Sequence, residues 1–378
     1  MKRLQILLLA IMAVTLFSCK PQPSPVDPGM FNLGSGVLVL NEGVYQFSDG
    51  GSLSFYDPEA DTVANKLFYK VNGIPIGDVP ESMALLNGKL FIVVNSSNYI
   101  YKVDANTLVL DTTKPYQLVD FYSPREMHIV APNKAYVSDL IGKGLWIINP
   151  QDMTHCGFVE TGKTTEKMVQ VGNELYVSNW SNYYFPAMEK NTVQVVDINN
   201  DVKVAEIRVG KEPNTMVVDK NNHVWVLCEG ATWQDGGEKP TMWEIDPMLK
   251  TAQCRYTFDD VVDPETGEVI RFAASNIKAD PTGRYFYVIV SHVDEDGDAS
   301  DSEVHRFDVE TQQFSETFCI SSEGDTFYNM AVDPRTGEIY VSRIGNPVAP
   351  GMLYRYTADG VLLSSFKADI FPSAMLFK

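Results

Sequence analysis

Basic residues are scarce in this sequence, and long apolar runs are absent after the first eighteen residues. A membrane-spanning helix needs roughly twenty consecutive apolar residues, and no later stretch approaches that length. The 378 residues include 30 Lys and Arg against 49 Asp and Glu, a formal net charge of −19 at pH 7. Because no cluster of basic residues offsets this charge, we expect no nucleic-acid partner. A neutral or cationic ligand suits such a surface better.

Cysteine is also scarce, and the five cysteines show neither CxxC nor Cys/His metal-binding spacing. We expect Cys156, Cys228, Cys254 and Cys319 to be small buried residues, with disulfides as the alternative. The motifs of common enzymes are missing: there is no Gly-x-Ser-x-Gly elbow, no His-Glu-x-x-His and no phosphate-binding glycine-rich loop before a helix. These absences favour a binding protein over an enzyme.

The first eighteen residues have the pattern of a secretory signal, with basic Lys2 and Arg3, an apolar segment and small Ser18. Residues 16–19, LFSC, resemble a bacterial lipobox and predict a lipidated Cys19, with an ordinary cleaved signal as the alternative. The following proline-rich segment has no apolar periodicity. We therefore expect a signal peptide over residues 1–18, a lipidated Cys19 and flexible tether over 19–35, and a folded domain over 36–378. The membrane is then contacted through the lipid alone.

A short alternating phrase recurs through the folded part of the chain. Its seven copies are SLSFYDP, YIYKVD, LWIINP, VQVVD, MWEIDP, VHRFD and LYRYT, which end at or near Asp57, Asp104, Asn149, Asp197, Asp246, Asp308 and Thr357. Successive copies are 45 to 49 residues apart, with one interval of 62. A period of this size, with several period-two runs in each unit, is typical of a β-propeller with four-stranded blades. The predicted fold is therefore an all-β, seven-bladed propeller.

The first unit lacks its innermost strand, and the C-terminus supplies one. The segment FPSAMLFK at the end of the chain matches the start of the second unit, because Pro372 to Met375 read PSAM where Pro80 to Met83 read PESM. We expect this C-terminal strand to complete the first blade, which closes the ring and removes an exposed sheet edge. No apolar pattern of helical period and length competes with the strand pattern.

In such a propeller, one face collects two sets of residues. These are the loops between the second and third strands of each blade and the first residues of the innermost strands. The predicted polar ligand-binding residues on this face are Glu81, Asn95, Arg125, Asp139, Glu166, Asn179, Asn214, Asn276, Asn329 and Arg343. The predicted aromatic ones are Tyr45, Phe47, Tyr99, Trp180, Tyr183, Tyr184, Phe185 and Trp233. Rigid aromatic residues on loops are typical of binding surfaces, although the rings could instead pack back onto the blades.

Two candidate metal sites are also present in the sequence. Asp294, Asp296, Asp298 and Asp301 lie around Gly297 in a loop that partly resembles a calcium-binding loop but lacks the EF-hand spacing. A solvated loop tip is the alternative. Glu81, Glu166, Asn214, Asn276 and Asn329 resemble the channel residues of propeller lactonases and could hold a divalent ion. In the alternative interpretation, they satisfy backbone groups at the rim.

The phrases GVLVLNEGVYQFSDGGSLSFYDPE and VGKEPNTMVVDKNNHVWVLCEG resemble those of YncE-like propeller lipoproteins of Bacteroidota, a group that includes the BtuG cobalamin-capture proteins. The resemblance covers residues 36–378. It implies a corrinoid such as vitamin B12 as ligand, with no further cofactor required. It also implies a cell-surface outer-membrane location and a TonB-dependent, BtuB-like transporter as partner. A metal-dependent hydrolase and a protein-interaction propeller remain as alternatives.

Overall fold

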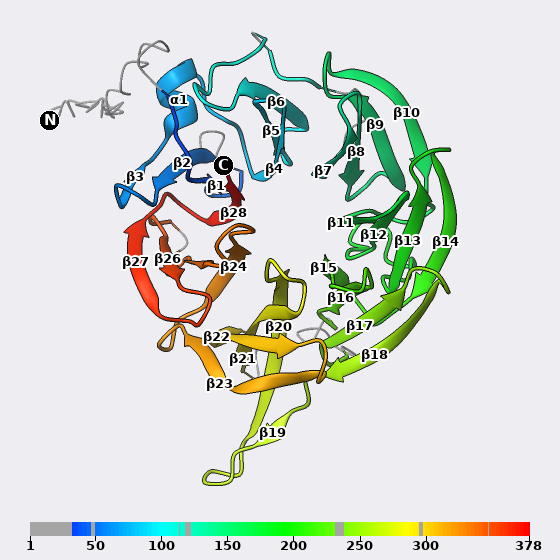
Figure 1. Ribbon diagram of the computed structural model, residues 1–378, viewed down its shortest axis with the longest axis vertical. Coiled ribbons are helices and arrows are strands. Elements are labelled where there is room, and N and C mark those ends of the chain that lie inside the picture. The colour runs from blue at the N-terminus through cyan, green and yellow to red at the C-terminus, as the bar shows by residue number, and fades with distance from the viewer. Residues whose placement is uncertain are drawn as a thin grey trace, which may run out of the picture.

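The structure is a computed structural model that describes residues 32–46, 50–112, 114–117, 122–230, 238–294, 298–346 and 348–378. Seven antiparallel sheets are arranged in a ring around a central axis (Figure 1), which confirms the predicted seven-bladed propeller. Within the described residues there is a single helix, α1 (Leu67–Asn72), so the chain is all-β as expected. Cys19 and the signal segment lie outside the described residues.

The first blade is built from both ends of the chain. Its sheet has the order β28 (Pro372–Phe377), β1 (Val37–Asn41), β2 (Ser52–Asp57) and β3 (Thr62–Ala64). β28 pairs antiparallel with β1, with Leu376 opposite Leu38. Beyond the strands, the Lys378 amide donates to the Gly36 carbonyl at 2.8 Å. The predicted closure of the ring by the C-terminal strand is therefore confirmed.

The other blades follow in chain order, each beginning with its innermost strand except where β19 precedes β20. The second blade contains β4 (Pro80–Leu86), β5 (Lys89–Val94) and β6 (Tyr99–Asp104). The third contains β7 (Pro124–Ala131), β8 (Lys134–Asp139), β9 (Gly144–Asn149) and β10 (Thr154–Glu160). The fourth contains β11 (Met168–Val171), β12 (Glu174–Ser178), β13 (Thr192–Asp197) and β14 (Val202–Arg208).

The fifth blade contains β15 (Pro213–Val218), β16 (Val224–Cys228), β17 (Thr241–Asp246) and β18 (Thr251–Thr257). The sixth contains β19 (Val261–Val262), β20 (Val269–Ala279), β21 (Tyr285–Val293), β22 (Ala299–Asp308) and β23 (Gln313–Ser321). The seventh contains β24 (Phe327–Val332), β25 (Ile339–Arg343), β26 (Met352–Tyr356) and β27 (Leu362–Lys367).

Two blades depart from the regular four strands. In the second blade, isolated bridges from Ile100 to Tyr116 and from Val103 to Leu110 stand in place of a regular outer strand. In the sixth, β19 and an extended β20 form an additional hairpin, which accounts for the one long interval of the repeat. Helix α1 packs Leu67 and Phe68 into the core beside the first blade. With only six residues, it is too short to produce a recognisable helical period.

The core lies between neighbouring blades. Middle strands such as β1 and β16 are buried along their whole length, because adjacent blades cover both of their faces. Trp225 of the fifth blade, for example, packs against Phe286 and Phe307 of the sixth with ring centroids 5.4 and 5.5 Å apart. Leu33 is also buried in a core cluster, so the packed domain begins before the expected boundary at residue 36.

The described cysteines differ from the prediction of small buried residues. Cys228 is buried in β16, whereas Cys156, Cys254 and Cys319 are exposed. The exposed cysteines lie in β10, β18 and β23, which are the outermost strands of their blades and are not covered by a neighbouring strand on one side. All four are free thiols, so the alternative of disulfides among them is not seen.

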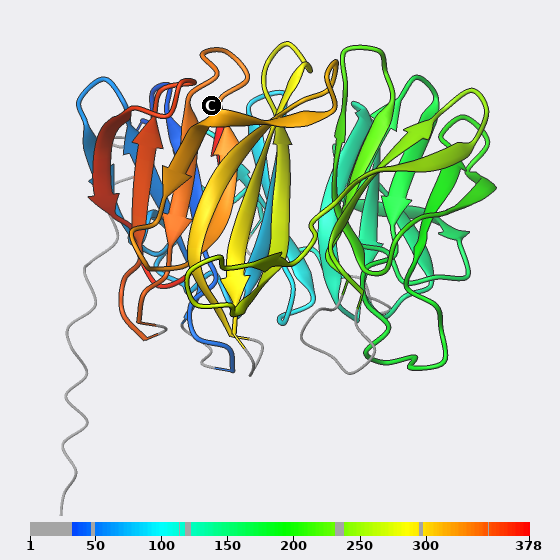
Figure 2. The ribbon, with the colours of Figure 1, turned by 90° about the horizontal axis from the view of Figure 1, so that it is seen from below.

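Because the strands alternate in direction, one face collects the connections predicted from the sequence. We call it the mouth face; it forms the lower edge in Figure 2, opposite the C-terminus. It carries the described loops between second and third strands, such as residues 140–143 and 179–191, and the starts of the innermost strands. The short turns between third and fourth strands, such as residues 247–250, lie on the opposite face.

Candidate functional site

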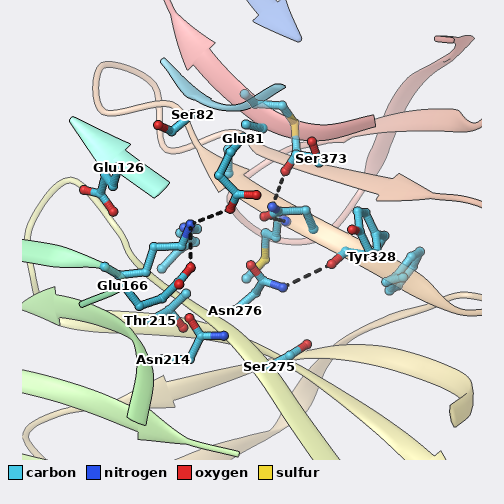
Figure 3. Close-up of a pocket in the computed structure, with 18 of the residues that line it drawn as sticks. Glu81, Ser82, Glu126, Glu166, Asn214, Thr215, Ser275, Asn276, Tyr328 and Ser373 are labelled. Carbon is cyan, nitrogen blue, oxygen red and sulfur yellow. Dashed lines mark hydrogen bonds and ion pairs between the residues drawn. The ribbon is translucent and has the colours of Figure 1, made fainter. Parts of the chain in front are cut away.

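A cavity of about 940 Å³ runs along the centre of the ring. Its walls are mainly the innermost strands of the blades. These strands begin at the mouth face, and side chains of their first residues point into the cavity (Figure 3). The sequence places polar residues at these starts, and the lining therefore contains many ionisable side chains. The acidic ones are Glu42, Glu81, Glu126, Glu166 and Glu229, and the basic ones are Arg125, Lys167 and Lys278.

Four of these side chains form one ionic network across the second, third and fourth blades. Arg125 donates through Nε to both oxygens of Glu166 at 3.0 and 2.8 Å and through Nη1 to Glu81 Oε2 at 2.7 Å. Lys167 Nζ lies 3.2 Å from Glu81 Oε1 and 3.6 Å from Glu166 Oε1. Burial by itself would raise the pKa of Glu166, but Arg125 and Lys167 hold it below its ordinary value.

This network bears on the predicted metal site in the channel. A divalent ion held by Glu81 and Glu166 would have to displace two cations that already neutralise these carboxylates. Among the described residues, the clusters of metal-binding atoms do not include the channel carboxylates. The geometry therefore favours a structural role for Glu81 and Glu166 in holding three blades together at the rim.

On the fifth blade, Glu229 faces the cavity beside Asn214 and Trp180. Its Oε1 accepts from Asn214 Nδ2 at 2.8 Å, and its Oε2 accepts from Trp180 Nε1 at 2.9 Å. Burial raises the pKa of Glu229 to about 7, so the group titrates near neutral pH. The Oδ1 atom of Asn214 is buried and has no hydrogen-bond partner in the described part of the chain. This corner of the cavity thus presents an unused acceptor.

A second carboxylate of this kind lies on the first blade. The Tyr328 hydroxyl donates to both oxygens of Glu42 at 3.1 Å. Burial and the nearby charge of Glu81 raise the pKa of Glu42 to about 7. The cavity therefore carries two carboxyl groups that are partly protonated at neutral pH, in addition to the ionised network.

Glu42 and Glu229 were not among the residues predicted to bind a ligand, although the sequence holds a signal for them. Each directly follows the second strand of its blade, in the phrases VLVLNEG and VWVLCEG. Gly43 and Gly230 follow with φ of 77° and 78°, and a side chain at either would collide with facing backbone. Because only glycine fits there, the chain turns sharply and leaves the preceding glutamate beside the channel.

Further along the channel, Glu126 and Lys278 also line the cavity. Burial raises the pKa of Glu126, and burial lowers the pKa of Lys278 to about 8. The nearby positive charge of Lys167 lowers the pKa of Lys278 further. The cavity lining is therefore rich in ionisable groups, although apolar side chains such as Met83 and Met330 also line it.

The structure brings six of the predicted polar residues together at this cavity, and Figure 3 labels four of them. They are Glu81, Arg125, Glu166, Asn214, Asn276 and Asn329. Asn276 and Asn329 each use their amide nitrogen on a neighbouring blade, Asn276 on the Tyr328 carbonyl at 3.1 Å and Asn329 on the Ser373 carbonyl. These two residues fit the alternative interpretation, in which rim amides satisfy backbone groups.

Four predicted polar residues lie away from the cavity, which corrects the prediction. Asp139 is fully buried and accepts from the backbone amides of Ser123, Ile141 and Gly142. Asn179 is likewise buried and donates to Thr164.

Asn95 and Arg343 also serve the scaffold. Asn95 donates to the Ser123 hydroxyl at 2.8 Å. Arg343 lies 3.2 Å from Asp325 and packs its guanidinium over the Tyr354 ring. All four residues end or directly follow second strands, where the side chain turns toward an adjoining connection and secures it.

The predicted aromatic residues divide into exposed and packed sets. Tyr45, Tyr183 and Tyr184 are exposed on mouth-face loops, with 64, 79 and 54% of their surface accessible. Tyr183 and Tyr184 form an edge-to-face pair with centroids 5.0 Å apart.

The packed rings follow the alternative interpretation. Phe185 is half-buried with Lys143 Nζ 4.0 Å from its ring centre. Tyr99 donates to the Ile76 carbonyl at 3.0 Å and packs against the first core cluster. Trp180 lines the cavity, and the predicted residues Phe47 and Trp233 lie outside the described residues.

The acidic loop does not assemble the predicted calcium ligands among the described residues. Asp294 Oδ1 accepts from the Asp298 amide at 2.8 Å. Asp301 lies in β22, 3.8 Å from His292 Nδ1, and accepts from the Gly324 amide. Asp296 lies outside the described residues. Calcium binding by this loop therefore stays a prediction.

Within the described residues, no helix has the length and apolar character needed to cross a membrane. Among curated proteins, no relative matches the chain.

Comparison with solved structures finds the same fold at low sequence identity. The periplasmic gluconolactonase of Pseudomonas aeruginosa is 12% identical, with a TM-score of 0.65, over 91% of this chain and 99% of that one. A hypothetical selenium-binding protein from Sulfolobus tokodaii is 9% identical, with a TM-score of 0.67, over 94% and 96%. A quinonprotein alcohol dehydrogenase-like protein from Bacteroides thetaiotaomicron is 16% identical, with a TM-score of 0.62, over 92% and 79%. At these identities the likeness establishes the fold alone.

One sequence family includes almost all of the propeller. The model of the family described as Domain of unknown function (DUF5074) matches residues 35–378. The match begins one residue before the boundary expected from the repeat and ends with β28. The chain therefore belongs to the DUF5074 family.

Proposed function

We propose that this propeller is a lipid-anchored binding protein of the cell envelope that captures a corrinoid at its mouth face. In this proposal no further cofactor is needed, and the ligand passes to a TonB-dependent outer-membrane transporter. The observation that carries the binding role is the exposure of three tyrosines, the paired Tyr183 and Tyr184 and the separate Tyr45, on the face where the central cavity opens. The corrinoid and the transporter are motivated by the resemblance of the first and fifth repeats to YncE-like lipoproteins.

Exposed tyrosines suit a large amphipathic ligand. Each offers apolar area with few rotatable bonds, so little conformational entropy is lost when a ligand covers it. Tyr183 and Tyr184 come from one loop of the fourth blade and form a pair on which one face of a ligand can rest, whereas Tyr45 comes from the first blade, on another side of the ring (Figure 1). None of these three rings is needed for the core, since each is more than half accessible.

The cavity beneath supplies partners for amide groups, which fringe a corrinoid ring. Asn214 Oδ1 is an acceptor without a partner, and an amide N–H from the ligand would satisfy it. Glu42 and Glu229, with pKa values raised to about 7 by burial, can each donate or accept a hydrogen bond. A polar cavity of about 940 Å³ is also large enough for a substantial part of such a ligand.

Titration with cyanocobalamin, followed by calorimetry and absorbance, tests this function. Removing an aromatic anchor typically costs 2 kcal/mol or more, so the double variant Tyr183→Ala/Tyr184→Ala should bind roughly thirtyfold more weakly. Met248→Ala is the matched control, because Met248 is 92% exposed in the turn between β17 and β18 on the opposite face. Absence of heat and of spectral change with the unaltered protein would refute corrinoid capture.

Hydrolysis is a second candidate function, favoured by the raised pKa of Glu229. A carboxylate with a pKa of about 7 in a cavity is suited to general base catalysis at neutral pH. Structural neighbours of the chain include proteins described as gluconolactonases and putative 6-phosphogluconolactonases. Incubating the protein with a gluconolactone separates the two functions, because a capture protein should not accelerate hydrolysis of the lactone above the uncatalysed rate.

A further inference from the structure

A cluster of donor atoms lies on the sixth blade, away from the mouth and the channel. In the antiparallel pair of β22 and β23, His305 is directly opposite Cys319. Glu303 is two residues before His305 and therefore on the same face of the sheet. His305 Nε2 is 2.9 Å from Glu303 Oε2, and the donor atoms of all three residues lie within 4.8 Å of one another. The Cys319 side chain is exposed, so the cluster is open to solvent.

We propose that Glu303, His305 and Cys319 form a binding site for a late first-row divalent ion, of which Zn²⁺ is the representative. A tetrahedral zinc site with ligand distances of about 2.0–2.3 Å places its donor atoms about 3.5 Å apart. Small side-chain movements would therefore bring the three donor atoms from their present spacing to that of a zinc site. Three protein ligands leave one coordination position open for water or a ligand group.

The donor types select the metal. Thiolate and imidazole are ligands of zinc and its neighbours, whereas calcium takes oxygen ligands only. The site is thus different in chemistry from the calcium loop predicted at residues 294–301. Asp301 is close enough to influence Cys319 electrostatically and adds negative charge near the ion. Without metal, burial and the neighbouring Glu303 raise the pKa of the Cys319 thiol to about 12, so a bound ion must displace that proton into solvent.

A second cluster with similar donor types provides a comparison. Asp219, His223 and Glu244 also bring donor atoms within 4.8 Å. There, however, Asp219 accepts from the His223 amide at 2.8 Å and from Trp225 Nε1 at 3.2 Å, and Glu244 pairs with Arg255 at 2.6 Å. These atoms already hold a turn and two strands together. His305 and Glu303 hydrogen-bond to each other, and within the described residues Glu303, His305 and Cys319 make no such side-chain hydrogen bond to a turn, so their donor atoms are available to an ion.

Titration of the reduced, metal-free protein with Co²⁺ tests the site, because a thiolate bound to cobalt produces a charge-transfer absorption. We expect one equivalent of cobalt with this absorption, displaced by Zn²⁺. The absorption should be lost in Cys319→Ser and retained in Cys254→Ser, whose cysteine is exposed in the outermost strand of the fifth blade. His305→Ala should weaken binding tenfold or more, and His223→Ala should leave it unchanged. Thermal melts establish that each variant is folded.

Alkylation provides a second, independent measurement that needs no substitution. Zn²⁺ should protect Cys319 from alkylation, as mapped by mass spectrometry, while exposed Cys156 and Cys254 react as before. The proposal is overturned if the unaltered protein gives no sulfur-to-cobalt absorption, if Cys319→Ser keeps it, or if Zn²⁺ leaves Cys319 unprotected. Because these readouts do not involve cobalamin, their failure is distinct from failure of the proposed capture function.

Discussion

Glu42 and Glu229 show how a short local pattern places a titratable group. In both, a buried strand ends in a glutamate followed by a glycine with φ near 77°, and the turn leaves the carboxyl group beside the channel. The pattern repeats in two blades only, the first and the fifth. At the corresponding positions of other blades, residues such as Asn95 and Asn179 turn away from the axis and secure an adjoining connection.

The raised pKa of Glu229 predicts a defined pH dependence of stability. Burial raises the folded-state pKa from 4.5 to about 7. Between these values the folded protein holds a proton that the unfolded chain has lost, so stability falls as the pH rises through this window. Glu229→Gln removes the titration, and the glutamine amide can donate to Asn214 Oδ1, the acceptor already without a partner in the described residues, once the Asn214 side chain rotates.

We therefore expect Glu229→Gln and the unaltered protein to have similar stability at pH 5. At pH 8.5 the variant should be more stable, by about 2 kcal/mol. Denaturant unfolding at the two pH values measures this difference, and Glu59→Gln, at an exposed position, is the control. An effect of the same size at both pH values would contradict the assignment of a raised pKa.

At the scale of single elements, β28 decides the integrity of the ring. It pairs with β1 along its length and contributes Met375 and Phe377 to the core cluster between the first and seventh blades. It also lines the channel with Ser373 and Ala374. This C-terminal strand therefore contributes to the sheet of the first blade, to the core between the first and seventh blades, and to the wall of the cavity.

Deleting residues 371–378 should destabilise the protein by more than about 4 kcal/mol or prevent folding, because β1 loses its inner partner and the core loses buried side chains. Thermal melting of the truncated protein measures the loss. Addition of a peptide with the sequence of residues 370–378 is the control and should restore part of it. A truncated protein that is soluble and melts at the original temperature would contradict the importance of this closure.

At the scale of the whole molecule, the formal net charge of −19 sets which surfaces the protein can approach. The channel lining holds five acidic and three basic side chains, and Arg125 and Lys167 pair with Glu81 and Glu166. Most of the excess negative charge therefore lies elsewhere on the chain. Such a surface repels anionic membranes and nucleic acids and leaves the lipid at Cys19 as the proposed means of attachment.

Replacing Cys19 by alanine should release the protein from the membrane fraction, because Cys19 is the proposed site of lipidation. The melting temperature of the propeller should not change, since its core begins only at Leu33. Cell fractionation with immunoblotting measures the first effect and a thermal melt the second. Membrane association of the Cys19→Ala protein with an unchanged N-terminus would contradict the lipoprotein assignment.

The fold could be predicted from the sequence, because period-two runs that recur every 45 to 49 residues have one common solution, and the PSAM and PESM segments indicate how the ring closes. The starts of the innermost strands were also located, except that β20 begins at Val269, before the expected Asn276. Six of the ten polar residues predicted to bind a ligand line the cavity.

The pairing, orientation and pKa of these polar side chains could be seen only in the tertiary structure. Whether Arg125 is free or paired, whether Asp139 faces a ligand or its own backbone, and whether Glu229 has a raised pKa depend on neighbours 41, 16 and 15 residues away in the chain. Burial and pairing are properties of these long-range contacts, and the cluster of Glu303, His305 and Cys319 likewise exists only because β22 and β23 are in one register.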